Sequence, residues 1–238
     1  MPRVVTLDEY RTMPRPDVSW LLPGLLAKPA SLLLIGSPKA GKSTLALQLG
    51  LALAQGKAFL GSQAQKCSVL YFQQDESEAS WRFSKLNVLH NHGVDLSGPL
   101  YMVHPEDSRR GINVLDPLGR EYMAATVAAV NPQVVIVDTV REVFAGDEND
   151  SATMRGVIAS LSSAVMGPLR VLVLVHHIHK LNPLVPTPRP CDAARGSSYL
   201  AGAVDAIWML HQSQLIIQSR YGDTTMALKR SASGLFTR

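Results

Sequence analysis

The chain has 238 residues, of which 46% are hydrophobic and 18% are charged, and its formal net charge is +4. This length and composition suit one large α/β domain and exclude a wholly disordered chain. The mild basic excess is compatible with a nucleic-acid partner, but it fits an ordinary enzyme equally well. The two cysteines, Cys67 and Cys191, form no CxxC pair, so a disulfide framework or zinc ribbon is excluded and a reducing cytoplasmic location is expected.

The N-terminal segment predicts neither a signal peptide nor a membrane anchor. It is polar and contains prolines, and no apolar run in the chain reaches the roughly 18 residues that span a bilayer. We therefore expect no membrane partner. Residues 1–30 are interpreted as an N-terminal arm, and residues 31–238 as a single α/β domain.

Short apolar runs alternate with helical patterns from residue 31 onward. We predict strands at 31–36, 68–73, 99–103, 133–138 and 170–176, and helices at 42–55, 76–90, 116–130 and 151–165. Continuous apolar runs are typical of strands buried on both faces of a parallel sheet. Weaker strands are predicted at 206–210, 214–219 and 225–230, with no helices between them. The fold class is therefore α/β, with a mostly parallel twisted sheet flanked by helices and antiparallel strands at its C-terminal edge.

The motif GSPKAGKS fits the phosphate-loop pattern G-x-x-x-x-G-K-[ST], between a predicted strand and a predicted helix. Glycines let successive N–H groups face a phosphate, and the helix dipole adds to anion binding. Lys42 is expected to bridge the β- and γ-phosphates, and Ser43 to ligate Mg²⁺. The alternative is a tight strand-to-helix turn without a nucleotide. The predicted ATP-binding positions are Gly36, Ser37, Pro38, Lys39, Ala40, Gly41, Lys42, Ser43 and Thr44.

Three acidic residues lie at or just after the ends of buried strands and are candidates for Mg²⁺ binding and catalysis. Asp138 ends the run QVVIVD, where ligands of open α/β sheets bind, so we interpret it as the Walker B carboxylate that reaches Mg²⁺ through water. Its alternative is a helix cap. Asp75 and Glu76 end the run VLYFQQDE, and at least one is expected to orient the attacking water. The alternative is that both are solvated charges at a helix N-terminus.

Three histidines follow the strand VLVLVHHIHK. Metal binding by His176, His177 and His179 would need further ligands, and the sequence shows none. A histidine at the strand end, beside Asp138, could instead sense the nucleotide by hydrogen bonding to the γ-phosphate. Purely structural histidines are the third possibility.

With these motifs in place, the chain resembles RecA-like ATPases of the RepA type, the hexameric plasmid replicative helicases and their AAA-family relatives. The resemblance covers about residues 17–236 and includes a RecA-like ATPase domain over 31–238. It depends on an ordered set of motifs, of which HHxxK followed by RGSS is the most specific. The motifs are GSPKAGKST, YFQQDES, VVIVDTVREVFAGDENDSATM, HHIHK and ARGSSYLAGAVDAIW.

The resemblance implies a ring, expected to be a hexamer, with ATP bound between adjacent subunits. It places the catalytic carboxylate at Asp75, where the family usually has Glu, so Glu76 is kept as an alternative. It places the sensor at His176 or His177. It also implies that a basic residue of a late strand, Lys229 or Arg230, reaches the neighbouring subunit's γ-phosphate, with Arg195 as another candidate.

Two loops would face the channel of such a ring, where single-stranded DNA is the expected partner. The Pro-rich loop 180–198 carries Lys180, Arg189 and Arg195, whose charges suit a phosphate backbone. The loop 141–150 contains Asp147, Glu148 and Asp150. These acidic residues argue against DNA contact and favour a solvated turn before a helix.

Three functions follow from these motifs. The first is an ATPase motor that couples ATP hydrolysis to DNA translocation or unwinding in replication. The second is a nucleotide-dependent switch or loader without helicase activity. The third, a small-molecule kinase, would need an Arg-rich lid that the sequence does not offer.

Overall fold

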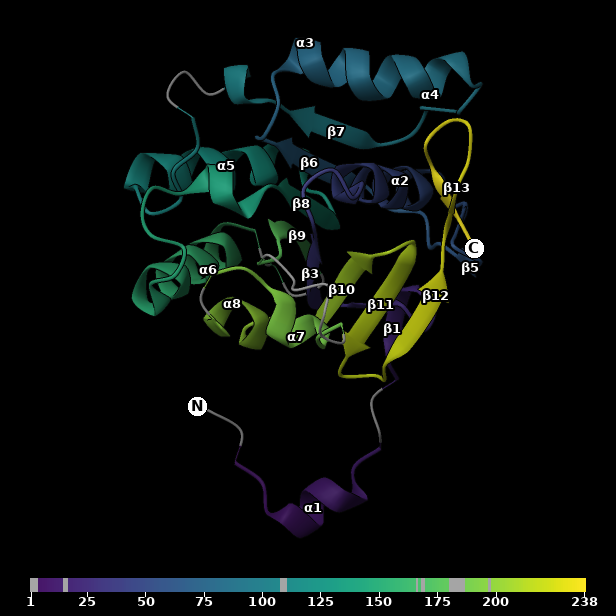
Figure 1. The fold of residues 1–238 in the computed structure, drawn as a ribbon. Helices are drawn as coiled ribbons and strands as arrows, with labels where there is room; N and C mark the ends of the chain where they lie inside the picture. Colours follow the sequence, from purple (N-terminus) through teal and green to yellow (C-terminus); the bar gives the residue numbers. More distant parts are fainter. Residues whose placement is uncertain are drawn as a thin grey trace.

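Eight strands form the central sheet, in the order β12-β11-β10-β3-β9-β8-β6-β7 (Figure 1). The computed structural model describes residues 4–14, 17–107, 111–165, 167, 170–179, 187–196 and 198–238. The five strands predicted most firmly are all present and are mutually parallel. They are β3 (Ala30–Gly36), β6 (Val69–Gln73), β7 (Leu100–Val103), β8 (Val134–Asp138) and β9 (Val171–His177).

The C-terminal strands depart from the prediction in one respect. Strand β10 (Ala206–His211) pairs parallel with β3, so it belongs to the parallel part of the sheet. Only β11 (Gln214–Ser219) and β12 (Thr224–Ala227) are antiparallel. The short helices α7 (Pro190–Ala193) and α8 (Ser198–Gly202) precede β10 and supply the crossover that the sequence pattern did not indicate.

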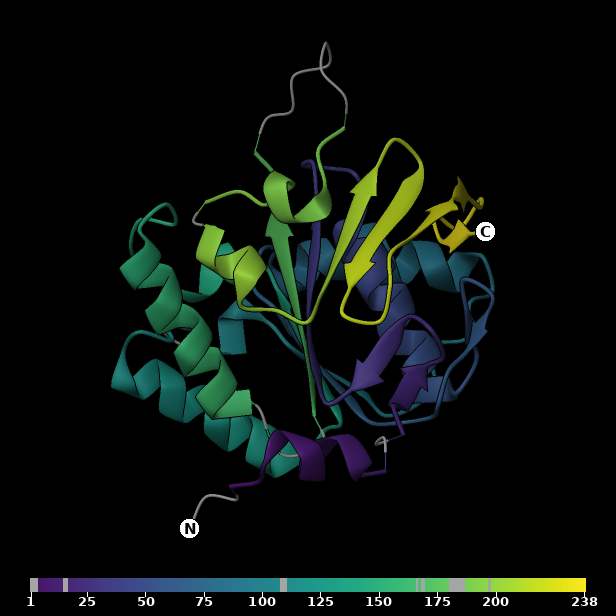
Figure 2. The same cartoon turned by 90° about the horizontal axis from the view of Figure 1, so that it is seen from below.

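Helices cover both faces of the sheet, and each face has its own apolar core (Figure 2). One core contains α2 (Lys42–Gln55) and the helical segment 78–91. The other contains α5 (Pro117–Val130), α6 (Ser151–Val165) and α8. Alternate residues of β3 divide between them, since Leu32 and Leu34 face the first core and Leu33 faces the second. A fully buried Leu or Val contributes roughly 1.5–3 kcal/mol, so these strands anchor the fold.

The predicted helix at 76–90 is composite. It consists of α3 (Glu78–Trp81), a π-helical turn η1 (Arg82–Leu86) and α4 (Asn87–Asn91). A π-turn inserts one extra residue into a helix and often lies at a functional site. Here it turns Lys85 toward the pocket described below.

The N-terminal residues form a helix and a hairpin. Helix α1 (Leu7–Thr12) buries none of its residues and hangs below the domain in Figure 1. The hairpin of β1 (Ser19–Leu22) and β2 (Leu26–Lys28) places Leu21, Leu22 and Leu26 in the same core as α2. The arm boundary at residue 30 stays a prediction, although residues 19–28 pack on the domain.

The remaining elements are short. They are the pairs β4 (Ala58–Phe59) with β5 (Ser62–Gln63) and β13 (Lys229–Arg230) with β14 (Phe236–Thr237), and the 3-10 turns η2 (Pro105–Asp107) and η3 (Val140–Val143). Within the described ranges, no helix has the length and apolarity needed to cross a membrane.

Candidate nucleotide site

The phosphate loop connects β3 to α2 at the carboxyl end of the sheet. Gly36 lies against β10, where a side-chain Cβ would come 2.8 Å from the Leu210 carbonyl oxygen. Gly41 has a φ of +104°, a left-handed conformation that favours glycine. The two glycines of the motif thus have different roles. Gly36 allows close packing of β3 against β10, and Gly41 allows the turn into α2.

The N-terminus of α2 faces the pocket. Among the described residues, no side chain caps this helix at Gly41. The first N–H groups of the helix therefore keep their capacity to bind an anion, and the helix dipole favours negative charge there. This is the local arrangement that the sequence motif predicted.

Lys42 is the first residue of α2, and its side chain is buried. Its Nζ donates to the carbonyl oxygens of Gly36 at 3.0 Å and Ser37 at 3.1 Å, and it lies 3.3 Å from Nδ1 of His177. Burial lowers the pKa of Lys42, while the charges of Asp138 and Asp75 act in the opposite direction. The Lys42 ammonium is thus held at the loop by two backbone carbonyl oxygens, and none of the three contacts is with a carboxylate.

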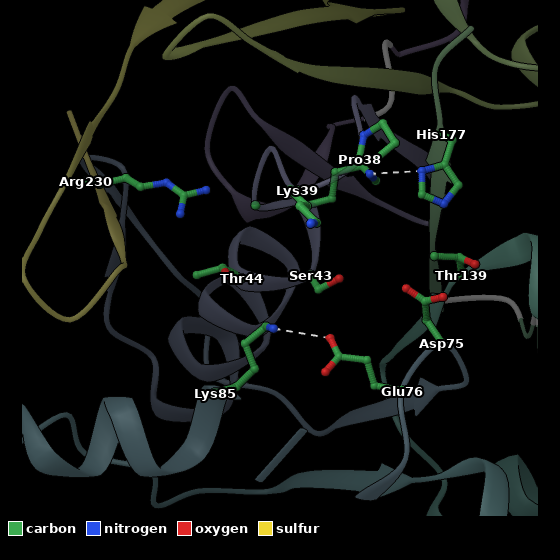
Figure 3. Close-up of a pocket in the computed structure, with 12 residues that line it drawn as sticks. Pro38, Lys39, Ser43, Thr44, Asp75, Glu76, Lys85, Thr139, His177 and Arg230 are labelled. Atoms are coloured by element: carbon green, nitrogen blue, oxygen red, sulfur yellow. Dashed lines mark hydrogen bonds and ion pairs between the residues drawn. The ribbon is translucent and has the colours of Figure 1, made fainter. Parts of the chain in front are cut away.

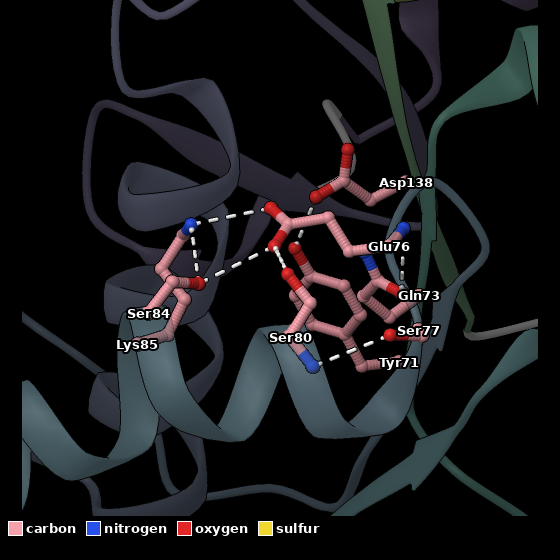
Figure 4. Close-up of polar contacts among 8 residues, drawn as sticks. All are labelled: Tyr71, Gln73, Glu76, Ser77, Ser80, Ser84, Lys85 and Asp138. Carbon is pink, nitrogen blue, oxygen red and sulfur yellow. Dashed lines mark hydrogen bonds and ion pairs between the residues drawn. The ribbon is translucent and has the colours of Figure 1, made fainter.

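Asp138 is fully buried at the end of β8. The Tyr71 hydroxyl donates to its Oδ2 at 2.6 Å, as Figure 4 shows. Burial raises the pKa of Asp138, although Tyr71 and Ser43 hydrogen bonding and the Lys42 charge lower it. The carboxylate therefore lies next to Ser43 and Lys42, as the Walker B interpretation requires.

Two oxygens at this strand end lack a hydrogen-bond partner among the described residues: Oδ1 of Asp138 and Oγ1 of Thr139. Buried oxygen atoms are rarely left unsatisfied, and oxygen is the ligand type that Mg²⁺ and its waters prefer. Together with the Ser43 hydroxyl, these atoms fit a hydrated Mg²⁺ beside the phosphates.

We expect Asp138→Asn to stabilise the nucleotide-free chain, because burial disfavours the charged carboxylate and a neutral amide avoids that cost. Tyr71 can still donate to the amide oxygen. The pKa of Asp138 is higher in the folded chain than in the unfolded chain. The buried charge therefore lowers the stability of the fold fully at a pH above the folded pKa, and it has no effect at a pH below the unfolded pKa, where the carboxyl is protonated in both states.

The gain should therefore be largest at neutral pH and disappear in acid. Thermal unfolding of both chains across pH tests this. A variant that unfolds at a lower temperature at pH 7 would contradict it. If the proposed nucleotide site is correct, the same variant should also lose Mg²⁺-dependent ATP turnover. A variant that is more stable but inactive would show that Asp138 is kept for function and not for stability.

A pocket of about 410 Å³ opens in front of the phosphate loop. Figure 3 shows its side chains: Asp75, Thr139 and His177 lie on one side of the loop and Arg230 on the other. Asp138 and His177 end β8 and β9, and Asp75 lies two residues after β6; in the sheet, β8 pairs with both β6 and β9. Parallel pairing thus brings together residues far apart in the sequence.

Asp75 and Glu76 both line the pocket, but their surroundings differ. The Glu76 carboxylate accepts hydrogen bonds from Ser80 at 3.1 Å and Ser84 at 3.3 Å, and it pairs with Lys85 at 3.3 Å (Figure 4). Asp75 is solvent-exposed at the pocket wall. Glu76 is therefore held by the helical segment that follows it, whereas Asp75 faces the space in front of the loop.

The structure separates the two candidate sensor histidines. His177 lines the pocket and contacts Lys42. His176 is fully buried, its Nε2 lies 3.1 Å from the Arg195 carbonyl oxygen, and burial lowers its pKa to about 4. Burial and the Lys42 charge also lower the pKa of His177. Within the described ranges, no group of three or more His, Cys, Asp or Glu residues could hold a metal ion.

The late-strand basic residues lie beside the phosphate loop. Arg230 donates to the Ala40 carbonyl oxygen of its own chain at 2.6 Å. Lys229 is exposed and borders a neighbouring cavity. The resemblance implied that one of them reaches a neighbouring subunit, and the observed contact of Arg230 is with its own loop.

The candidate DNA-binding residues differ in their surroundings. Arg195 pairs with Glu148 at 2.6 Å, and the Glu148 side chain is buried. Exposed Arg189 pairs with Asp192 at 2.9 Å. Lys180 lies outside the described residues. The expected solvated turn at 141–150 therefore needs a correction, because Glu148 is a buried partner of the second loop, whereas Asp150 caps α6 through Thr153.

Sequence reasoning missed three residues of this region: Tyr71, Lys85 and Glu148. A tyrosine within a fully buried strand needs a partner for its hydroxyl, and that signal could have pointed to Asp138. No pattern pointed to Lys85, because a π-turn places it. The distant partner of Glu148 also had no local signature.

Comparison with known proteins gives a family and a fold. A model of the family described as "AAA domain" matches residues 1–183. No curated protein matches the chain in sequence. A solved KaiC-like protein from the hyperthermophilic archaeon Pyrococcus horikoshii OT3 is 14% identical over 91% of this chain and 92% of that chain, with a TM-score of 0.56. The fold is therefore RecA-like. Because 468 solved chains share it, the fold alone selects no activity.

Proposed function

We propose that this chain, which belongs to the AAA domain family, binds Mg²⁺ and ATP at the phosphate loop and hydrolyses the ATP as a ring-forming motor on single-stranded DNA. Family and fold together make it a RecA-like P-loop ATPase domain. One observation carries the proposal: Lys42, Asp75, Asp138 and His177 converge at the uncapped N-terminus of α2.

Binding of the phosphates is assigned to the loop 36–44. Its N–H groups and the Lys42 ammonium would hold the phosphate oxygens, and Ser43 and Asp138 would hold the metal ion. When bound, Mg²⁺ supplies positive charge that offsets the charge developing on the phosphates. Tyr71 orients Asp138 for this role through its 2.6 Å hydrogen bond.

Asp75 is assigned the water-orienting role. It is exposed in the pocket, while Glu76 is engaged by two serines and Lys85. The shorter Asp side chain still reaches a water in front of the loop if that water lies close to the strand end. Glu76 then acts as a positioning residue that ties the helical segment 78–91 to the pocket.

His177 is assigned as the sensor of the nucleotide. Its pKa is lowered, so it is neutral at pH 7, and its Nδ1 can accept from Lys42. Its Nε2–H is then available to a γ-phosphate. His176 carries the signal onward, because it contacts Arg195 in the second loop.

The ring and the DNA partner are supported by the resemblance to RepA-type helicases and by the mildly basic chain. In a hexamer, Lys229 is the candidate that extends to a neighbouring γ-phosphate. Lys180 and Arg189 are the candidates for the DNA backbone. The Arg195 charge is matched by buried Glu148, whereas the pair of Arg189 with Asp192 is solvent-exposed and therefore weak.

These ion pairs favour a second function. Two of the three expected DNA-binding charges are engaged within the chain, Arg195 by Glu148 and Arg189 by Asp192, so a nucleotide-dependent switch or loader in replication or recombination is the alternative. Such a protein would couple nucleotide state to partner binding without unwinding DNA.

The steady-state ATPase rate, measured against protein concentration at two salt concentrations with and without single-stranded DNA, separates the two. We expect a rate that rises steeply with concentration and is stimulated by DNA at low salt, because phosphate contacts weaken with salt. A rate that depends neither on protein concentration nor on DNA would contradict the motor hypothesis and favour the switch or loader.

A further inference from the structure

The C-terminal hairpin of β13 and β14 is hydrogen-bonded to the first half of α2. Gln48, four residues after Thr44, donates to the Phe236 carbonyl oxygen at 2.7 Å and accepts from the Phe236 N–H at 2.8 Å. The Phe236 side chain is buried. These two hydrogen bonds hold the hairpin beside the phosphate loop of the same chain.

Arg230 is held on that loop by two contacts. Its Nη2 donates to the Ala40 carbonyl oxygen at 2.6 Å, and its guanidinium lies 4.8 Å from the centroid of the Phe236 ring. A side chain at Gly41 would collide with both Arg230 and Phe236. Arg230 therefore occupies the immediate surface of the loop that would hold the phosphates.

The position of Arg230 along the loop indicates which end of a nucleotide it meets. Figure 3 shows it on the Thr44 side, opposite the side of Asp75, Thr139 and His177. The metal and sensor candidates mark the γ-phosphate end. Arg230 thus lies toward the α-phosphate and nucleoside.

A cavity next to Arg230 supports placing the nucleoside on this side of the loop. It has a volume of about 520 Å³, and Ala40, Gln212, Lys229 and Phe236 are among its lining residues. It shares Arg230 with the phosphate pocket. A nucleotide with its phosphates on the loop has room for its nucleoside on this side.

We propose that Arg230 binds the α-phosphate end of the nucleotide held by its own chain, so that it contributes to binding of nucleoside diphosphates as well as triphosphates. The proposal rests on the proposed nucleotide site. A guanidinium has five N–H donors, so Arg230 can keep the Ala40 bond while it donates to a phosphate. The hairpin then senses occupancy rather than the γ-phosphate.

Equilibrium binding of ADP and ATP, at a protein concentration where sedimentation shows monomers, tests the proposal. We expect Arg230→Gln to weaken both about 10-fold or more, as expected for one charge-assisted hydrogen bond. Glutamine keeps a donor for Ala40, so the hairpin stays in place, which thermal unfolding without nucleotide verifies. Arg220→Gln is the matched control, because Arg220 pairs with Asp205 away from the pocket.

A mixing experiment separates action within the chain from action on a neighbour. Arg230→Gln lacks the guanidinium and Lys42→Ala lacks the loop lysine, so turnover restored in a mixture would mean that Arg230 serves a neighbouring site. We expect no restoration. Restored turnover, or ADP affinity equal to that of the unmodified chain, would overturn the inference. If the unmodified chain binds neither nucleotide, the proposed function itself fails.

Discussion

Replacing Lys42 with alanine is expected to abolish ATP turnover. The Lys42 ammonium contacts two carbonyl oxygens of the phosphate loop and Nδ1 of His177. Lys42 is buried, and in surroundings of low polarity its charge interacts more strongly with a phosphate than it would in water. Removal of one donor to a developing charge typically lowers a rate by about 10²–10³-fold, and we expect at least that loss.

The measurement is release of inorganic phosphate from ATP by the two chains at equal concentration. Lys66→Ala is the control, since Lys66 is exposed, lies before the amino end of β6 and is not among the residues that line the pocket. Thermal unfolding checks that the Lys42 variant is folded. Retained turnover in a folded Lys42→Ala chain would remove the assignment of residues 36–44 as a phosphate loop.

Asp75→Asn and Glu76→Gln are expected to have different consequences. The Asp75 variant should keep ATP binding but lose hydrolysis by about 10²–10⁴-fold, the usual contribution of a positioned general base. The Glu76 variant should retain most of its turnover. Its carboxylate is already engaged by Ser80, Ser84 and Lys85, and an amide can keep part of that network.

ATP affinity and single-turnover hydrolysis, measured separately, distinguish these outcomes. Both substitutions preserve size, so each serves as the control for the other. The reverse pattern would move the water-orienting role to Glu76. Normal hydrolysis by both variants would mean that neither carboxylate is catalytic.

The strands could be predicted because their signal is local. Runs such as VVIVD are buried on both faces, and a continuous apolar run needs no knowledge of its partners. The range of β10 was predicted for the same reason, but its parallel pairing with β3 was not. Its run is equally apolar, but its parallel pairing with β3 depends on a crossover through short helices without clear periodicity.

The pocket was predictable where a motif carries its own geometry. The phosphate loop and the strand-end residues Asp75, Asp138 and His177 are of this kind. Lys85, Glu148 and the cis position of Arg230 were not, because no local sequence pattern signals any of them. A π-turn places Lys85, a partner 47 residues away neutralises Glu148, and a hairpin fastened by Gln48 delivers Arg230.

Release of inorganic phosphate from ATP by the unmodified chain, with Mg²⁺ and with a chelator, is the most direct measurement of the proposed activity. We expect phosphate release that requires Mg²⁺ and is saturable in ATP. Absence of release above the buffer rate, at high protein concentration and with single-stranded DNA present, would contradict the assignment of this pocket as a catalytic ATP site.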